Sequence, residues 1–459
     1  MSTVLIAGAT GFIGRALAER LKGRYRVVGL TRTNVSPPPY PGIGWRSCDL
    51  FSLLQCERAL EGVDTAFYLV HSMLPSAHLT QGAFEDMDLI MADNFARAAE
   101  RAGVKQIIYL GGLTPDTPDL SPHLKSRLEV ERTLGSRRVP VTALRSGLVV
   151  AAGGSSFEML LRIVRRLAAI PCPPWARTPS QPIALSDLLD LLLHCLDHPH
   201  TRNRSFDVGG PDVLSYRQML EGAAAALGLK RRFIEMPWRG TSWCRRWVAL
   251  VTGAPQELVA PLLESMRLPM VARDKRLQEQ AGIPGMSYDA ALRKAIADEK
   301  PAEPFGGRSR GPQYNVRSVQ RIPLPPGGTA HWAAEQYSAW LPLLFRTFIR
   351  AERDDGKDVR LVLKFPRVTL LQHSFAHDRN QAPDRQVFYI TGGLLARPEQ
   401  RTTRRARLEF REVLGGTCLL VAIHDYRPTL PWPLYKLTQA VIHPWVVRQF
   451  ARYLATLAK

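Results

Sequence analysis

Apolar runs and amphipathic segments alternate along roughly the first third of the chain. The apolar runs predict short buried strands at Val4–Ala7, Val27–Leu30, Thr65–Val70, Gln106–Leu110 and Val141–Leu144. Apolar residues at helical spacing predict helices between them, at Ile13–Leu21, Gln81–Ala102 and His123–Leu134. Strands that alternate with helices are typical of a parallel sheet covered on both faces, so we predict an α/β, doubly wound fold here.

The pattern then becomes less regular and finally changes in kind. Residues from about 155 to 300 are more helical and irregular, and residues 301–327 are rich in proline, glycine and arginine, which predicts a connector. Beyond it, a helix, four strand-like runs and a closing helix are predicted at 331–350, 359–374, 386–396, 405–412, 417–424 and about 432–457. This order indicates a separate α+β domain over residues 328–459.

Length and composition fit a globular protein with two or three domains. A chain of 459 residues is too long for one ordinary core, and 45% hydrophobic with 22% charged residues is an ordinary balance. No run reaches ~18 apolar residues, so no membrane-spanning helix is expected, and the first residues lack the basic leader of a signal peptide. The six cysteines never stand at Cys-x-x-Cys spacing, so we expect no metal site and a cytoplasmic location.

Positive charge is concentrated near the end of the chain. The net charge is +20, and residues 301–459 contain 24 Lys and Arg against 12 Asp and Glu. Such a field attracts nucleic acid, anionic lipid or phosphorylated ligands. No nucleic-acid-binding motif accompanies it, so no nucleic acid partner is expected. Two interpretations remain: a basic solvated surface, or peripheral contact with an anionic membrane through the basic amphipathic closing helix. The pattern carries no signal for oligomeric state.

The strongest chemical signal is a glycine-rich turn in the stretch VLIAGATGFIGRAL. Three glycines at GxxGxxG spacing follow a predicted strand and open a predicted helix, which is the context of a dinucleotide-binding turn. They permit a tight turn, close approach of the backbone to a pyrophosphate, and close packing of helix on strand. The phosphates would lie on N–H groups at the positive end of the helix. The predicted cofactor contacts are Gly8, Thr10, Gly11, Phe12, Ile13 and Gly14.

The residue after the second predicted strand bears on which nicotinamide cofactor binds. An NAD site would place Asp or Glu at the end of GLTRT to accept from the ribose hydroxyls, but Arg32 stands there. An arginine fork suits a 2′-phosphate. We therefore expect NADP(H), with NAD as the alternative.

Several motifs carry a family resemblance in the first part of the chain. They are GATGFIG, CDL (48–50), YLVHSM (68–73), HxxxR (123–127), LRSGLVVAAGGSSFE (144–158), PIALSDL (182–188) and FDVGGPDVLSY (206–216). In this order they resemble atypical short-chain dehydrogenases of the extended, NmrA-like kind, close to the bacterial YbjT-type proteins. The resemblance implies a Rossmann fold over residues 1–300 with a small substrate lobe at about 155–300. The residues that it implies beside the cofactor's adenine, ribose and pyrophosphate are Asp49, Leu50, Leu69, Val70 and His71.

A second resemblance concerns residues 328–459. The stretch RARLEFREVLGGTCLLVAIHDYRP, followed by a long helix, is similar to START/polyketide-cyclase domains. The resemblance implies a helix-grip-like fold, in which a curved antiparallel sheet wraps a long helix and often encloses an apolar ligand.

All three catalytic residues usual in short-chain dehydrogenases are replaced. Gly111 and Gly112 stand where a serine polarises the substrate carbonyl, and nothing but the nearby Thr114 offers a hydroxyl. His123 stands at the position of the tyrosine that supplies a proton, and Arg127 at that of the lysine that holds the nicotinamide ribose. Because positions 123 and 127 share one helical face, we predict His123 and Arg127 as the catalytic pair, with Arg127 also contacting the cofactor.

The three replacements limit the reactions that the site is expected to catalyse. A positioned general acid contributes roughly 10²–10⁴-fold to a rate, so ordinary ketone reduction should be slow here. A quinone-like, hydrophobic acceptor suffers less, because it stabilises the charge that it receives. The sequence therefore predicts an NAD(P)H-dependent oxidoreductase for such a substrate, or a non-catalytic dinucleotide-binding sensor or assembly protein like NmrA-like regulators and the complex I nucleotide-binding accessory subunit. A sugar-nucleotide epimerase is disfavoured, because the tyrosine and lysine are absent.

Overall fold

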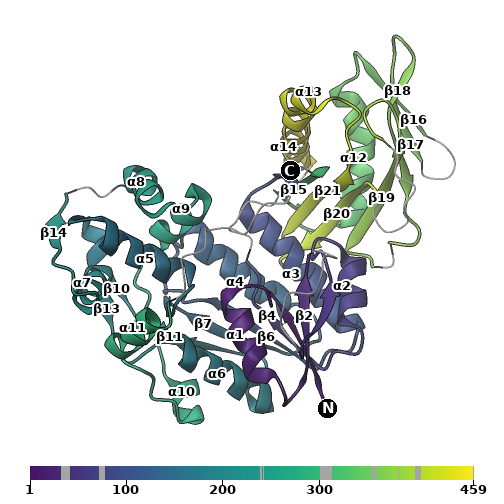
Figure 1. Ribbon diagram of the computed structural model, residues 1–459. Helices are drawn as coiled ribbons and strands as arrows, with labels where there is room; N and C mark the ends of the chain where they lie inside the picture. Colours follow the sequence, from purple (N-terminus) through teal and green to yellow (C-terminus); the bar gives the residue numbers. More distant parts are fainter. Residues whose placement is uncertain are drawn as a thin grey trace. The chain divides into compact units, whose positions relative to one another are not determined.

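The computed structural model divides the chain into two compact units. The first comprises Met1–Leu74 and Met91–Gly307, and the second comprises Pro75–Ile90 and Arg308–Lys459 (Figure 1). The described residues are 1–32, 42–71, 78–237, 240, 242–299, 313–353, 358–380, 382–397 and 405–457. The first part of the predicted connector, residues 301–312, lies outside them.

A seven-stranded parallel sheet forms the centre of the first unit. Its strands in spatial order are β12 (Arg204–Val208), β7 (Val141–Ser146), β6 (Gln106–Gly112), β4 (Thr65–Tyr68), β1 (Thr3–Ala7), β2 (Arg26–Thr31) and β3 (Gly44–Ser47). Every neighbouring pair is parallel, so the predicted doubly wound sheet is confirmed. β3 and β12 were not predicted, because neither is a continuous apolar run.

Helices cover both faces of this sheet (Figure 1). One face packs against α1 (Phe12–Leu21) and α6 (Leu185–Asp197), through residues such as Leu17 and Leu188. The other face packs against α2 (Leu53–Leu60), α3 (Phe84–Arg101) and α4 (Pro122–Leu134). Most of the buried strand residues are apolar on both faces, as expected where helices exclude water on each side.

The residues predicted as a substrate lobe divide between the main sheet with its helical layer and a separate small core. β12 and α6 lie within residues 155–300 but complete the main sheet and its helical layer. The other helices here are α5 (Ser155–Arg166), α7 (Tyr216–Ala226), α8 (Ser242–Thr252), α9 (Gln256–Ser265), α10 (Arg276–Ala281) and α11 (Tyr288–Ala297). α5, α7 and α11 share a small separate core.

The second unit contains an eight-stranded sheet. Its order is β16 (Ile349–Arg353), β17 (Val359–Leu363), β18 (Val368–Phe375), β19 (Arg385–Gly392), β20 (Arg407–Val413), β21 (Cys418–Tyr426), β15 (Gln313–Pro323) and β5 (His78–Gln81). All pairs are antiparallel except β15 with β5. The predicted connector was therefore wrong for residues 313–323, because flanking Pro and Gly obscured a strand that buries Val316, Val319 and Ile322.

Two long helices pack on one face of this second sheet. α12 (Ala330–Leu344) and α14 (Gln439–Leu457) bury aromatic residues between themselves and the strands. The Tyr337 ring lies 5.0 Å from that of Phe450, edge to face, and 5.3 Å from that of Phe410. The predicted α+β unit is confirmed, but the closing helix is two helices, because Thr438 separates α13 (Trp432–Leu437) from α14.

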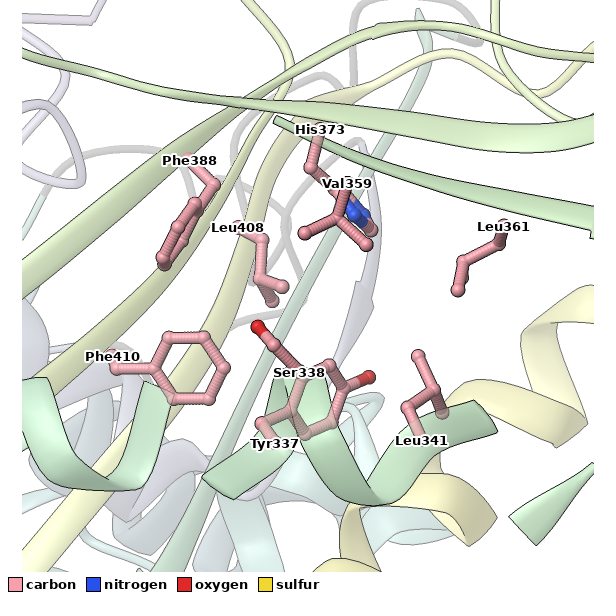
Figure 2. Close-up of a pocket in the computed structure, with 9 residues that line it drawn as sticks. All are labelled: Tyr337, Ser338, Leu341, Val359, Leu361, His373, Phe388, Leu408 and Phe410. Carbon is pink, nitrogen blue, oxygen red and sulfur yellow. The ribbon is translucent and has the colours of Figure 1, made fainter. Parts of the chain in front are cut away.

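A small cavity lies between α12 and the second sheet (Figure 2). It is lined by Tyr337, Ser338, Leu341, Val359, Leu361, His373, Phe388, Leu408 and Phe410. Its volume is about 20 Å³, which is room for about one water molecule. Among the described helices, none is both long enough and apolar enough to cross a membrane.

Candidate functional site

The turn between β1 and α1 has the geometry that its glycines predict. Gly8 has φ +95°, which glycine adopts without strain, and its carbonyl accepts from the N–H of Gly11 at 2.9 Å. A Cβ atom on Gly14 would lie 2.2 Å from the Gly8 carbonyl oxygen. The third glycine is therefore required for α1 to approach the turn this closely.

This turn can accept a dinucleotide pyrophosphate. α1 is ten residues long and begins at Phe12, and Gly11 at its N-cap has no side chain to satisfy the first N–H groups. Such a helix end favours phosphate oxygens through its N–H groups and its dipole. Thr10 is exposed beside it, and Ile13 is partly buried against the core.

The ends of β2 and β3 carry the residues predicted for the adenosine half of the cofactor. Arg32 is exposed directly after β2. The backbone at Asp49 is fixed, because its N–H donates to Gln55 Oε1 at 2.9 Å and its carboxylate accepts from the N–H of Phe51 at 3.2 Å. The neighbouring Leu50 is buried. These residues share the carboxyl edge of the sheet with the glycine turn, the edge where open α/β sheets bind ligands.

The end of β4 lies beside the glycine turn. The N–H of Leu69 donates to the Ala7 carbonyl at 3.0 Å, and a Cβ on Gly8 would meet the Leu69 carbonyl oxygen at 3.0 Å. Leu69, Val70 and His71 are each partly buried. The titratable side chain of His71 therefore follows directly after residues that border the glycine turn.

His71 and His123 form a pair that was not predicted. Their ring centroids are 4.9 Å apart, and His71 Nε2 lies 3.2 Å from His123 Nδ1, which is hydrogen-bond distance. His123 stands in the first turn of α4, which Ser121 caps by accepting from the N–H of Leu124 at 3.3 Å. The two histidines are 52 positions apart in the chain, so only the fold reveals the contact.

Arg127 lies one turn further along α4, against the ends of two strands. Its Nη1 atom is 3.5 Å from the Val70 carbonyl oxygen and 3.5 Å from the Tyr109 hydroxyl. That hydroxyl in turn donates to the Arg127 carbonyl at 3.1 Å. Tyr109 was missed, because it stands inside an apolar run and its ring is fully buried. The fold thus brings the predicted pair His123 and Arg127 to the end of β4.

No serine equivalent is supplied by the residues at the end of β6. A Cβ on Gly111 would lie 2.9 Å from the Tyr109 ring, and one on Gly112 would lie 3.4 Å from a methyl carbon of Leu124. The hydroxyl of Thr114 donates to the Gly112 carbonyl at 3.2 Å. The strand end is therefore packed for glycine, and the Thr114 hydroxyl is engaged with the backbone of that strand end.

An ion pair fixes α4 to the sheet. Glu131 accepts two hydrogen bonds from Arg145 on β7, at 2.9 and 2.6 Å, and one from the Ser205 hydroxyl at 2.6 Å. The hydrogen bonds with Glu131 are the main reason that the pKa of Arg145 is raised above its ordinary value. Because both charged side chains are mostly buried, this pair holds the helix that carries His123 and Arg127.

A parallel doubly wound sheet with this glycine turn defines a Rossmann-type dinucleotide-binding domain. Residues 4–126 match the model of the NAD dependent epimerase/dehydratase family. This part of the chain is therefore similar in sequence to NAD-dependent epimerase/dehydratase proteins.

Three curated proteins show related sequences. Auxiliary protein GraX of Staphylococcus aureus is 33% identical over 117 residues, covering 24% of this chain but only 36% of that protein. Sanguinarine reductase of Eschscholzia californica is 24% identical, and the match covers 45% of this chain and 88% of the length of that protein. Subunit 9 of the NADH dehydrogenase [ubiquinone] 1 alpha subcomplex of Arabidopsis thaliana is 21% identical, and the match covers 51% of this chain and 60% of the length of that subunit.

Solved structures support the fold of the first unit. A nucleoside-diphosphate-sugar epimerase from Staphylococcus aureus superposes with a TM-score of 0.52 at 14% identity, over 64% of this chain and 100% of that one. The Citrobacter sp. triphenylmethane reductase, determined in complex with NADP(H), gives 0.50 at 16% identity, over 64% and 99%. At these identities the likeness concerns the fold alone.

Proposed function

We propose that this protein binds NADP(H) in preference to NAD(H) and reduces a hydrophobic, quinone-like acceptor. The observation that carries the proposal is the His71–His123 pair, set at the end of β4 with Arg127 one helical turn away. Two of the similar proteins are reductases by name, which agrees with this reaction class. The exposed Arg32 supports the preference for the 2′-phosphate.

The first unit's own residues account for binding. The N–H groups of α1 and the glycine turn would hold the pyrophosphate, and Asp49, Leu50 and Leu69 would border the adenosine half. Arg127 would donate to ribose hydroxyls and keep positive charge near the reacting end, since its guanidinium stays protonated. When bound, NADPH supplies the hydride that a quinone takes up together with one proton, giving the hydroquinone and NADP⁺.

The histidine pair is suited to deliver that proton. At 3.2 Å, one of the two facing nitrogens must carry a hydrogen and the other must accept it. A proton taken up at one ring can therefore pass through the shared hydrogen bond to the other. The pair thereby replaces the acid function of the missing tyrosine. It does not replace the serine, which is why an acceptor that stabilises its own charge suits this site best.

Two substitutions test this role. His123→Gln and His71→Asn keep a hydrogen-bonding amide but cannot exchange a proton, so NADPH oxidation with a quinone panel should fall ~10²–10⁴-fold for His123→Gln. His200→Gln, at an exposed histidine elsewhere in the first unit, is the control and should leave turnover unchanged. NADPH affinity, measured separately, should change little in His123→Gln. Full turnover in both pair variants would refute the role of the histidines.

A non-catalytic nucleotide-binding protein is the second candidate, and the glycine-packed end of β6 favours it. A protein that only senses or carries the dinucleotide needs neither serine nor tyrosine. The similarity to a subunit of NADH dehydrogenase agrees with such a role, although only 60% of that subunit is covered. Tight NADPH binding by the wild-type chain, with no turnover on any quinone or enone, would select this candidate over the first.

For the second unit we infer a START/polyketide-cyclase-like domain. The antiparallel strands β16 to β21 with a long helix, α14, across one face support this inference. The cavity between α12 and the sheet is small, but its lining is of the kind found in ligand sites. Apolar side chains surround it, with the His373 ring and the Tyr337 hydroxyl among them (Figure 2). At room for about one water molecule, it would have to widen to take a quinone.

A further inference from the structure

Exposed apolar side chains gather at one end of the second unit. Each of them is between 40% and 92% exposed, although a folded protein usually covers residues of this size. They are Leu343, Phe348, Phe365, Leu434, Leu437, Val441, Ile442 and Trp445, and we call them the apolar end. A cluster of this kind on a folded chain marks an interaction surface.

Ring contacts between α12 and α14 show that these residues share one end. Trp340 stacks on Tyr453 at 5.8 Å, and Phe345, just past α12, lies 6.1 Å from Trp445, so the two helices run antiparallel (Figure 1). The last turn of α12 therefore lies beside the first half of α14. The N–H of Lys364 donates to the carbonyl of residue 348 at 2.8 Å, which brings the turn with Phe365 to the same place.

α14 presents two different faces. Its inner face buries Val447, Phe450 and Leu454 in the core of the second unit. Its outer face exposes Val441 and Trp445 one turn apart. The closing helix thus packs on its own sheet and still offers an apolar stripe to its surroundings.

The surroundings of the apolar end are basic. Residues 427–459, which contain α13 and α14, include five Lys and Arg and no Asp or Glu. Arg448 and Arg452 are exposed and continue the stripe of Val441 and Trp445 along the helix. Near Phe365 the exposed cations are Arg346, Lys364 and Arg367, of which Arg367 pairs with Glu352 at 2.8 Å.

We propose that the apolar end docks on the surface of an anionic membrane. Aromatic and aliphatic side chains would enter the headgroup region, and each nearby Lys or Arg would add roughly 1 kcal/mol of attraction to an anionic surface. A second copy of the chain is a poorer occupant, because a symmetric contact would bring two basic rims together. Nucleic acid would match the charge but leave the apolar side chains in water.

Vesicle co-sedimentation of the full chain tests the proposal. The protein should sediment with phosphatidylcholine vesicles that contain about 30% phosphatidylglycerol and much less with phosphatidylcholine alone. Raising the salt from about 50 to about 500 mM should weaken binding ~10-fold or more, because the charges are screened. Absence of sedimentation with the anionic vesicles at low salt would overturn the proposal.

Matched variants locate the surface. Leu437→Ser with Val441→Ser should reduce vesicle binding at least ~5-fold, since each removes exposed apolar area, while Leu250→Ser, at an 82% exposed leucine of α8, should not. Arg448→Glu should weaken binding more than Lys230→Glu, which makes the same charge change at an exposed lysine of the first unit. Equal losses in variants and controls would contradict this surface. So would unchanged vesicle binding together with a loss of self-association in light scattering, which would make the apolar end an interface between copies.

Discussion

We propose that Arg32 is the residue on which the choice between NADP(H) and NAD(H) depends. It follows β2 directly and is exposed, so its guanidinium can reach a ligand at the carboxyl edge of the sheet. A 2′-phosphate offers it charge-assisted hydrogen bonds that a ribose hydroxyl cannot match.

Arg32→Ala should therefore weaken NADPH binding ~10- to 100-fold, as expected for lost hydrogen bonds between charged groups, and change NADH binding by less than about twofold. Fluorescence titration with both nucleotides measures this directly. Arg26→Ala is the matched control, because Arg26 is exposed at the opposite end of the same strand. Equal losses for NADPH and NADH would remove the assignment.

The position of His373 within β18 determines the pH at which its ring takes up a proton. The residue lies on β18, is 8% exposed and lines the cavity under α12, and burial lowers its pKa to about 4. In an unfolded chain a histidine has a pKa near ~6.5, so between these values the unfolded state binds more protons than the folded one. The contribution of the neutral ring is therefore complete above about pH 6.5 and is lost as the pH falls to about 4.

Hydrogen exchange of β18 and β19 amides, corrected for intrinsic rates, should then show falling protection between pH 7 and pH 4.5. His373 accounts for up to ~3 kcal/mol of this loss. The His373→Gln variant has no group at this position that titrates in this range. The part of the pH dependence that His373 causes should therefore be absent from it. The same pH dependence in both proteins would show that His373 does not cause it.

Local pattern predicted most elements but not their long-range partners. The βαβ alternation and the glycine turn follow from periodicity and backbone chemistry, so β1, α1 and the doubly wound sheet could be predicted. The contact of His71 with His123 depends on which strand lies beside α4, and no local pattern carries that information. β5 is a further case, since a four-residue strand after β4 pairs with β15 more than 200 positions away.

At the scale of the whole molecule, two units carry different kinds of surface. The first has the sheet edge with the glycine turn, Arg32 and the histidine pair. The second has the apolar end, which basic residues surround. The charge of the second unit could be predicted from composition, since +12 of the net +20 lies in residues 301–459. The apolar end could not, because the exposed side of α14 is fixed by how its inner side packs against the sheet.

The proposed function requires a nicotinamide dinucleotide to bind at the turn between β1 and α1. Titration of the full chain with NADPH, followed by the fluorescence of the nicotinamide, is the most direct test. We predict saturable binding to one site with a dissociation constant in the range of ~1–100 µM, as is ordinary for such cofactors. Failure to bind either NADPH or NADH at concentrations near ~1 mM would contradict the account.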